Sequence, residues 1–282
     1  MKTESPWLHR YAIFVAFCAL IAIVAGALVT SLLRPIAGPI AAGPPAIIKS
    51  AQFWHHMTGG VTCILMIGLV VWLMLSKANS QLVRFGWIAL AAGLVEGGLG
   101  AKVVLQALPP LTDILHALLG QIFFGCIAAI AVMTAEGWTG GPEPMEDTWR
   151  PSMRSLAIAV PAIILLQTTL GASYRYHALG VLWHILNAMI VLLLILCVAV
   201  FLVRQLPLHP TLRPAAITLA VITSIQVMLG FTTFMMLILF PETSLAVVIT
   251  SVLHVTTGSL TFGAGLSLAV LIRHNTRLVV DI

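Results

Sequence analysis

Long apolar runs dominate the chain, and short polar or charged segments separate them. The runs cover roughly residues 11–33, 52–76, 84–106, 111–134, 155–173, 179–203, 214–239 and 245–272. Each is close to or above the length of about twenty residues that a helix needs to cross about 30 Å of hydrocarbon. A membrane barrel would instead show alternating segments of about ten residues. The pattern therefore predicts an all-α integral membrane protein with eight transmembrane helices.

Composition supports this prediction. Of the 282 residues, 60% are hydrophobic and only 8% are charged, whereas soluble domains are about 25% charged. So much apolar surface also excludes a solvated, disordered chain. The net charge of +5 does not indicate nucleic-acid binding, because the sequence has no basic patch with interleaved aromatic residues.

Polar residues divide the chain into two halves and predict its orientation. The longest polar stretch, 135–154, separates an N-terminal unit (1–138) from a C-terminal unit (139–282), each with four predicted helices. One face of the membrane would hold both termini and ten basic residues, namely Lys2, Arg10, Lys77, Arg84, Arg150, Arg154, Arg204, Arg213, Arg273 and Arg277. The other face would hold Arg34, Lys49, Lys102 and Arg175. The positive-inside rule therefore predicts that both termini are cytoplasmic.

The two halves share a repeated pattern. Residues 115–125 and 253–263 both read Leu-His-x3-Gly-x3-Phe-Gly, and a Trp-His pair occurs at 54–55 and again at 183–184. Because each half holds four helices, corresponding helices run in the same direction. The sequence thus predicts two pseudo-symmetric four-helix bundles, related by an axis along the membrane normal.

Three of the odd-numbered spans share a second pattern, in which a polar residue precedes a glycine by four positions. It reads Glu96-x3-Gly100, Gln167-x3-Gly171 and Gln226-x3-Gly230. An acid inside an apolar span is costly and usually functional. Glu96 is therefore a candidate proton-handling group or a partner for Lys102.

The even-numbered spans each carry one repeated histidine: His55, His116, His184 and His254. All four should lie at similar depth, in the outer part of the bilayer. Such histidines either form helix-to-helix hydrogen bonds or serve a function. Two neutral imidazoles on facing helices of a bundle suit one haem iron with two axial ligands. A zinc or copper site would need three or four clustered ligands, and the neighbours His55 and His56 point about 100° apart on a helix.

Further residues suit the same cofactor. Glycines one turn after a histidine, at 59, 120 and 258, either leave room for a flat macrocycle or allow close helix packing. Haem propionates need cations or water, and the outer face offers Lys49 and Arg175 besides Arg34 and Lys102. These cations could equally be ordinary interfacial charges.

Four parts of the chain are similar to a known protein family. They are the segments 95–125 and 226–263, the opening Trp7-Leu8-His9-Arg10-Tyr11, and residues 25–30. On these residues the chain resembles the haem A synthase family over nearly its whole length, except between the first two spans. The resemblance implies a resident haem b between His184 and His254. It also implies haem O as substrate between His55 and His116, where a methyl group is oxidised through hydroxylation to the formyl group of haem A. A bacterial-type cytoplasmic membrane would be its location, and haem O synthase and a terminal oxidase its partners.

The chain departs from the family at two places. The family carries Glu-x-x-His-Arg around the first histidine, where this chain reads Gln52-Phe53-Trp54-His55-His56. Gln52 cannot transfer a proton, and a register slipped by one residue would make His56 the ligand instead of His55. The cysteine pair of many members, between the first two spans, is also missing. Two alternatives therefore stay open: a b-type haem subunit that transfers electrons within a respiratory complex, and a haem-binding assembly partner without redox turnover.

Overall fold

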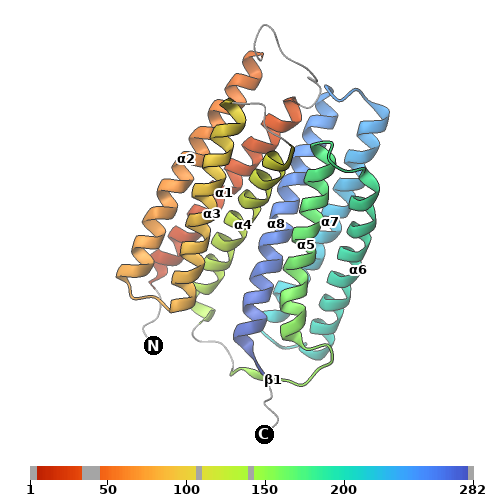
Figure 1. The fold of residues 1–282 in the computed structure, drawn as a ribbon. Coiled ribbons are helices and arrows are strands. Elements are labelled where there is room, and N and C mark those ends of the chain that lie inside the picture. Colours follow the sequence, from red (N-terminus) through yellow and green to blue (C-terminus); the bar gives the residue numbers. More distant parts are fainter. Residues whose placement is uncertain (1–4, 34–44, 106–109, 139–142, 279–282) are drawn as a thin grey trace.

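The computed structural model describes residues 5–33, 45–105, 110–138 and 143–278 (Figure 1). Within this part of the chain, eight helices are long and apolar enough to span a membrane. They are α1 (Pro6–Leu33), α2 (Ala46–Leu75), α3 (Ser80–Leu105), α4 (Pro110–Met133), α5 (Met153–Arg175), α6 (Val181–Gln205), α7 (Leu212–Leu239) and α8 (Leu245–Asn275). The predicted fold class, an all-α integral membrane protein of eight helices, is confirmed.

Most helix ends lie within a few residues of their predicted positions, and α2 shows the largest difference. It begins at Ala46, immediately after Pro45. No proline or glycine interrupts residues 46–51, so the helix continues beyond the apolar run to the first residue that cannot extend it. Lys49 therefore lies in the first turn of α2 rather than in the preceding loop. Similarly, Arg175 is the last residue of α5 and not a loop residue.

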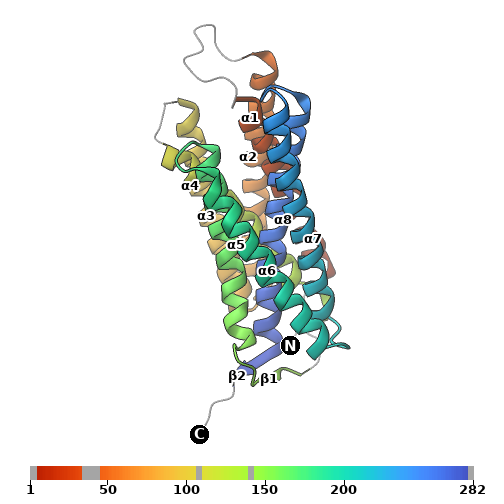
Figure 2. The same cartoon turned by 90° about the vertical axis from the view of Figure 1, so that its right-hand side faces the viewer.

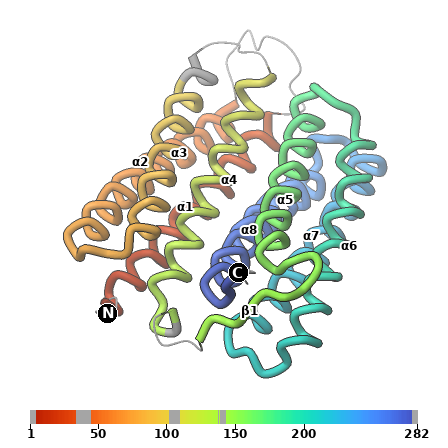
Figure 3. Tube along the Cα trace, turned by 60° about the horizontal axis from the view of Figure 1, so that its bottom comes forward, coloured from red at the N-terminus to blue at the C-terminus, as the bar shows by residue number. Residues whose placement is uncertain are grey.

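The helices form two rings of four, which lie side by side in Figures 1 and 3. In the first ring each of α1, α2, α3 and α4 packs against the next, and α1 closes the ring against α4. Helices α5 to α8 form the second ring in the same way. Consequently α2 and α4 face each other diagonally across one bundle, and α6 and α8 do so across the other.

The two bundles meet along α4 and α8, where the Phe-Gly part of the repeat makes a reciprocal contact. A Cβ atom added to Gly125 would lie 2.5 Å from the ring of Phe262, and one added to Gly263 would lie 2.8 Å from that of Phe124. Each phenylalanine thus packs on the glycine of the other half. Since real carbon contacts are about 3.5–4.0 Å, only glycine leaves enough room, and this part of the repeat serves packing.

Both termini lie at the same end of the molecule, where the chain between the bundles is fastened to α8 (Figure 2). Strand β1 (Met145–Asp147) pairs in parallel with β2 (Thr276–Leu278), which follows α8. The Asp147 carboxylate accepts hydrogen bonds from the backbone N–H groups of Met153 (3.0 Å) and Arg154 (2.9 Å) at the start of α5. The sequence pattern did not predict these strands or the short 3₁₀-helix η1 (Glu136–Trp138).

The outer surface of the bundles is apolar. Phe17, Ile64, Leu193 and Phe231 are each more than half exposed, which would be costly in water but suits lipid. The buried core lies inside each bundle and between the two, with Leu69, Ile130 and Ile195 among its members. The fold thus positions any polar group of the inner faces away from lipid.

Candidate functional site: two histidine pairs

Each bundle brings its two repeated histidines together at its centre. The rings of His55 on α2 and His116 on α4 have centroids 6.1 Å apart, with planes at 86°. The rings of His184 on α6 and His254 on α8 have centroids 6.1 Å apart, with planes at 88°. The two halves therefore hold nearly identical pairs on their diagonal helices.

Backbone carbonyls on the odd-numbered helices orient three of the rings. The Nδ1 atom of His55 lies 3.0 Å from the carbonyl oxygen of Ala22, and that of His116 lies 3.2 Å from the carbonyl of Glu96. His184 makes the corresponding contact with Gln167 at 3.3 Å. A carbonyl oxygen can only accept, so in His55 and His116 this contact places the proton on Nδ1 and leaves the lone pair of Nε2 free. In His184 the Gln167 amide nitrogen, a donor, lies closer to Nδ1 (3.0 Å) than the carbonyl oxygen does. Such bonds orient histidine ligands in metalloproteins.

A glycine four residues after each carbonyl allows the close approach. Cβ atoms added to Gly26, Gly100, Gly171 and Gly230 would lie 2.8–2.9 Å from Cε1 of the four histidines in turn. The repeat is therefore fourfold at the level of helix pairs, with Ala22-x3-Gly26 as its first copy. Sequence reasoning missed this copy because Ala22 takes part through its backbone, and only the glycine spacing could have revealed it.

His254 differs from the other three. Its Nδ1 atom is buried and, among the described residues, has no hydrogen-bond partner. The Gln226 amide nitrogen lies 3.5 Å from its Nε2 atom. Leaving a buried polar nitrogen unsatisfied costs free energy. Coordination of a metal by this ring would satisfy the demand, so the donor set suits an axial ligand.

Polar side chains from α3 and α7 lie against the histidines, beside glycines for which the sequence left two roles open: room for a macrocycle or close helix packing. Glu96 Oε1 is 3.3 Å from Nδ1 of His116. A Cβ atom added to Gly120 would lie 4.0 Å from that same oxygen, and one added to Gly258 would lie 3.1 Å from the Gln226 amide nitrogen. Gly258 therefore makes room for Gln226, whereas a Cβ atom at position 120 would make only an ordinary contact with Glu96. Gly59 differs, because nothing lies within 4 Å of its Cβ position.

His55 and His56, the two candidate ligands on α2, have different surroundings. His55 faces His116, whereas the neighbouring His56 is exposed, with its ring centroid 5.8 Å from that of His55. Gln52 is half-buried one turn before His55. This arrangement favours His55 over His56 as the residue that pairs with His116.

The predicted cations are found at the end of the molecule opposite the termini. Lys49 is exposed on α2. The Arg175 Nη2 atom donates to Thr30 Oγ1 (2.7 Å) and to Ser31 Oγ (2.8 Å) on α1, so this guanidinium bridges the two bundles. Arg34 and the side chain of Lys102 lie outside the described residues.

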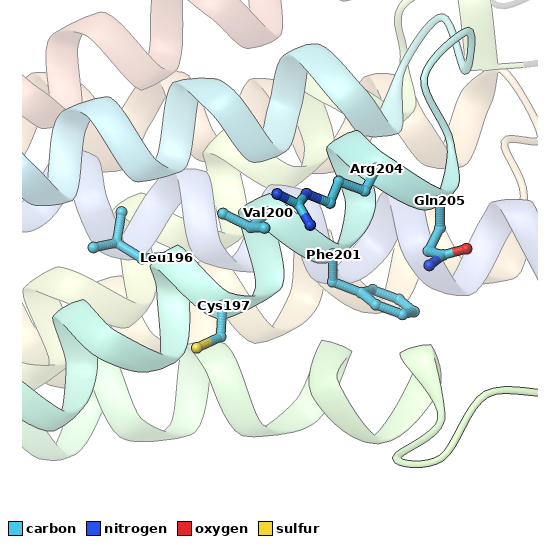
Figure 4. Close-up of a pocket in the computed structure, with 6 residues that line it drawn as sticks. All are labelled: Leu196, Cys197, Val200, Phe201, Arg204 and Gln205. Carbon is cyan, nitrogen blue, oxygen red and sulfur yellow. The ribbon is translucent and has the colours of Figure 1, made fainter.

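A shallow hollow on the outer face of α6 lies apart from the histidines (Figure 4). It is lined by Leu196, Cys197, Val200, Phe201, Arg204 and Gln205. These residues occupy the second half of α6, whereas His184 lies in its first turn. The apolar lining suits an acyl chain of the surrounding lipid and is separate from the candidate site.

Comparisons with known proteins do not assign the chain to a family. No protein-family model matches the chain, and no curated protein matches it significantly. Among the described residues, no three or more histidine, cysteine, aspartate or glutamate side chains form a cluster that could hold a metal ion. The fold and the site define a multi-pass membrane protein with two crossed histidine pairs in its interior.

Proposed function

We propose that each histidine pair holds one haem, with His55, His116, His184 and His254 as axial ligands. The spacing of the rings carries this proposal. An imidazole nitrogen lies about 2 Å from a bound metal ion and about 1 Å from its own ring centre, so two axial rings are centred about 6 Å apart. The separation in the structure is 6.1 Å in both bundles, and the carbonyl contacts leave Nε2 available on His55 and His116.

Within this proposal the two halves have different roles, as in the haem A synthase family that the sequence resembles. His184 and His254 hold a resident haem b, whose chemistry when bound is one-electron transfer. His55 and His116 would hold the substrate haem O, and oxidation of its methyl group to the formyl group of haem A would pass four electrons to an oxidant from outside this chain. Two differences between the halves support this division. Nothing lies within 4 Å of the Cβ position at Gly59, where the second half has Ala188. In addition, the first half has Glu96 where the second half has Gln226.

The two candidate cations would contact the propionates at the edges of the haems. Arg175, at the junction of the bundles, and Lys49 are placed to neutralise propionates. The end that holds both termini carries most of the basic residues, including Arg84, Arg154 and Arg273. This end is cytoplasmic under the positive-inside rule, in a bacterial-type cytoplasmic membrane. Haem O synthase and a terminal oxidase are the proposed partners.

Two observations favour a second function, that of a b-type haem subunit which transfers electrons within a respiratory complex. Gln52 stands where the family has its acid, and an amide cannot exchange a proton as a carboxyl group does. The two histidine pairs are also geometrically equivalent, as two electron-carrying sites would be.

Pigment analysis separates the two functions. The chain would be expressed in a host that makes haem O but no haem A, and the haems would be extracted from the purified protein and from the membranes. Haem A in these extracts supports the synthase function. Bound haem b without haem A at any expression level supports the electron carrier, and a protein without any haem overturns the proposal.

Two histidine variants provide a matched control for the first site. His55→Ala removes a ring that faces His116, so it should abolish formation of haem A and leave the haem between His184 and His254 in place. His56→Ala alters an exposed neighbour and should change neither. Equal effects of the two variants would contradict the assignment of His55.

A further inference from the structure

The polar side chains that touch the two histidine pairs differ in chemical type. In the first bundle, a carboxyl oxygen of Glu96 lies 3.3 Å from Nδ1 of His116, and both side chains are about one-fifth exposed. The backbone carbonyl of Glu96 lies 3.2 Å from the same Nδ1 atom. One residue therefore offers two oxygen atoms to this ring nitrogen.

In the second bundle, amide groups take this place. The Gln167 amide nitrogen lies 3.0 Å from Nδ1 of His184. Its orientation is fixed from both sides, because this nitrogen also donates to the carbonyl oxygen of His184 (3.0 Å) while Asn187 donates to Oε1 of Gln167 (2.8 Å). Gln226, the counterpart of Glu96 in the repeat, brings its amide nitrogen to 3.5 Å from the other ring nitrogen, Nε2, of His254.

A carboxyl oxygen and an amide N–H group act differently on a histidine that binds iron. A carboxyl group that accepts the ligand's Nδ1–H makes the imidazole a stronger electron donor. Stronger donation stabilises the more highly charged ferric state. An amide N–H group lacks this effect, and the low dielectric of the bundle interior strengthens the difference.

We infer that Glu96 is a positioning residue which acts through His116, and that it gives the first bundle's iron the lower reduction potential of the two. The inference rests on the proposed binding of one haem at each pair. It extends the proposal by assigning the asymmetry to a single carboxyl group. The two sites would otherwise be nearly equivalent, because their ring separations and plane angles agree.

The test is a potentiometric titration of the full-length protein, purified with its haems, in the wild type and in Glu96→Gln. The wild type should titrate as two one-electron components. Glu96→Gln should raise the lower one by about 59 mV, a tenfold change in its reduction equilibrium, and leave the other unchanged. Glu96→Asp keeps a carboxyl group and should retain part of the low potential, which a merely space-filling role would not require.

The reciprocal variant Gln226→Glu is the matched control in the second bundle, and it also serves if Glu96→Gln fails to fold. It should lower the higher component by a similar factor. The inference is overturned if both variants keep two haems and neither potential moves, or if Glu96→Gln moves only the higher component. A wild-type protein without haem overturns the proposed function as well, so the two failures are distinguishable.

Discussion

Substituting Gly100 by alanine tests whether close helix contact sets the position of a histidine ring. The added methyl carbon would lie 2.9 Å from Cε1 of His116. Carbon atoms pack best at about 3.5–4.0 Å, so the ring must retreat by roughly 0.6–1 Å. This retreat stretches the 3.2 Å contact between Nδ1 and the carbonyl oxygen of Glu96 and misaligns His116 with His55.

Overpacking of this kind costs about 1–3 kcal/mol, which corresponds to about 5- to 150-fold in affinity. The first bundle of Gly100→Ala should therefore lose haem by that factor, measured as the pigment retained during dilution in detergent. Gly98→Ala is the matched control, because nothing lies within 4 Å of the Cβ position at Gly98 and alanine favours the helix by up to about 1 kcal/mol. Equal haem retention in the two variants would refute the reasoning.

Three further predictions concern stability, each measured by thermal unfolding in detergent. Phe262→Ala removes a buried ring between α4 and α8 and should lower the free energy of unfolding by about 3–5 kcal/mol. Phe231→Ala, at an exposed position, should change it little. Similar losses of stability in the two variants would argue against the α4–α8 contact. Asp147→Ala removes the acceptor at the start of α5 and should cost about 0.5–2 kcal/mol, and an unchanged melting temperature would count against this role. Burial lowers the pKa of His209, between α6 and α7. The unfolded chain therefore binds more protons than the folded protein below about pH 6.5, so stability should fall with acidification. His209→Gln should flatten this dependence of stability on pH, and an equal dependence in both proteins would contradict the prediction.

The fold could be predicted almost entirely from the sequence, because hydrocarbon imposes a simple requirement on length and polarity. The starts of α1 and α2 were less accurate, since a helix extends past the apolar run until a residue such as Pro45 stops it. The strands β1 and β2 could not be predicted. Their three-residue segments pair only because α8 brings Thr276 beside Met145, which is a tertiary effect.

The candidate site was predicted through its side chains and missed where the backbone takes part. The histidines were evident as repeated polar residues in apolar spans. The carbonyl of Ala22 has no sequence signature, so the copy of the repeat on α1 was not recognised. The sequence also left two roles open for Gly258, because only the packing of α7 against α8 shows that the Gln226 amide lies beside it. Spacing along one helix does not reveal what a neighbouring helix places there.

The most direct test of the central proposal is the haem content of the purified protein, with the axial ligands identified by electron paramagnetic resonance. The account predicts two low-spin haem irons per chain, each with two histidine ligands. His184→Ala and His254→Ala should each remove the same single haem, and His116→Ala should remove the other. A purified chain without haem, or haem whose amount and spectrum are unchanged in all three variants, would contradict the account.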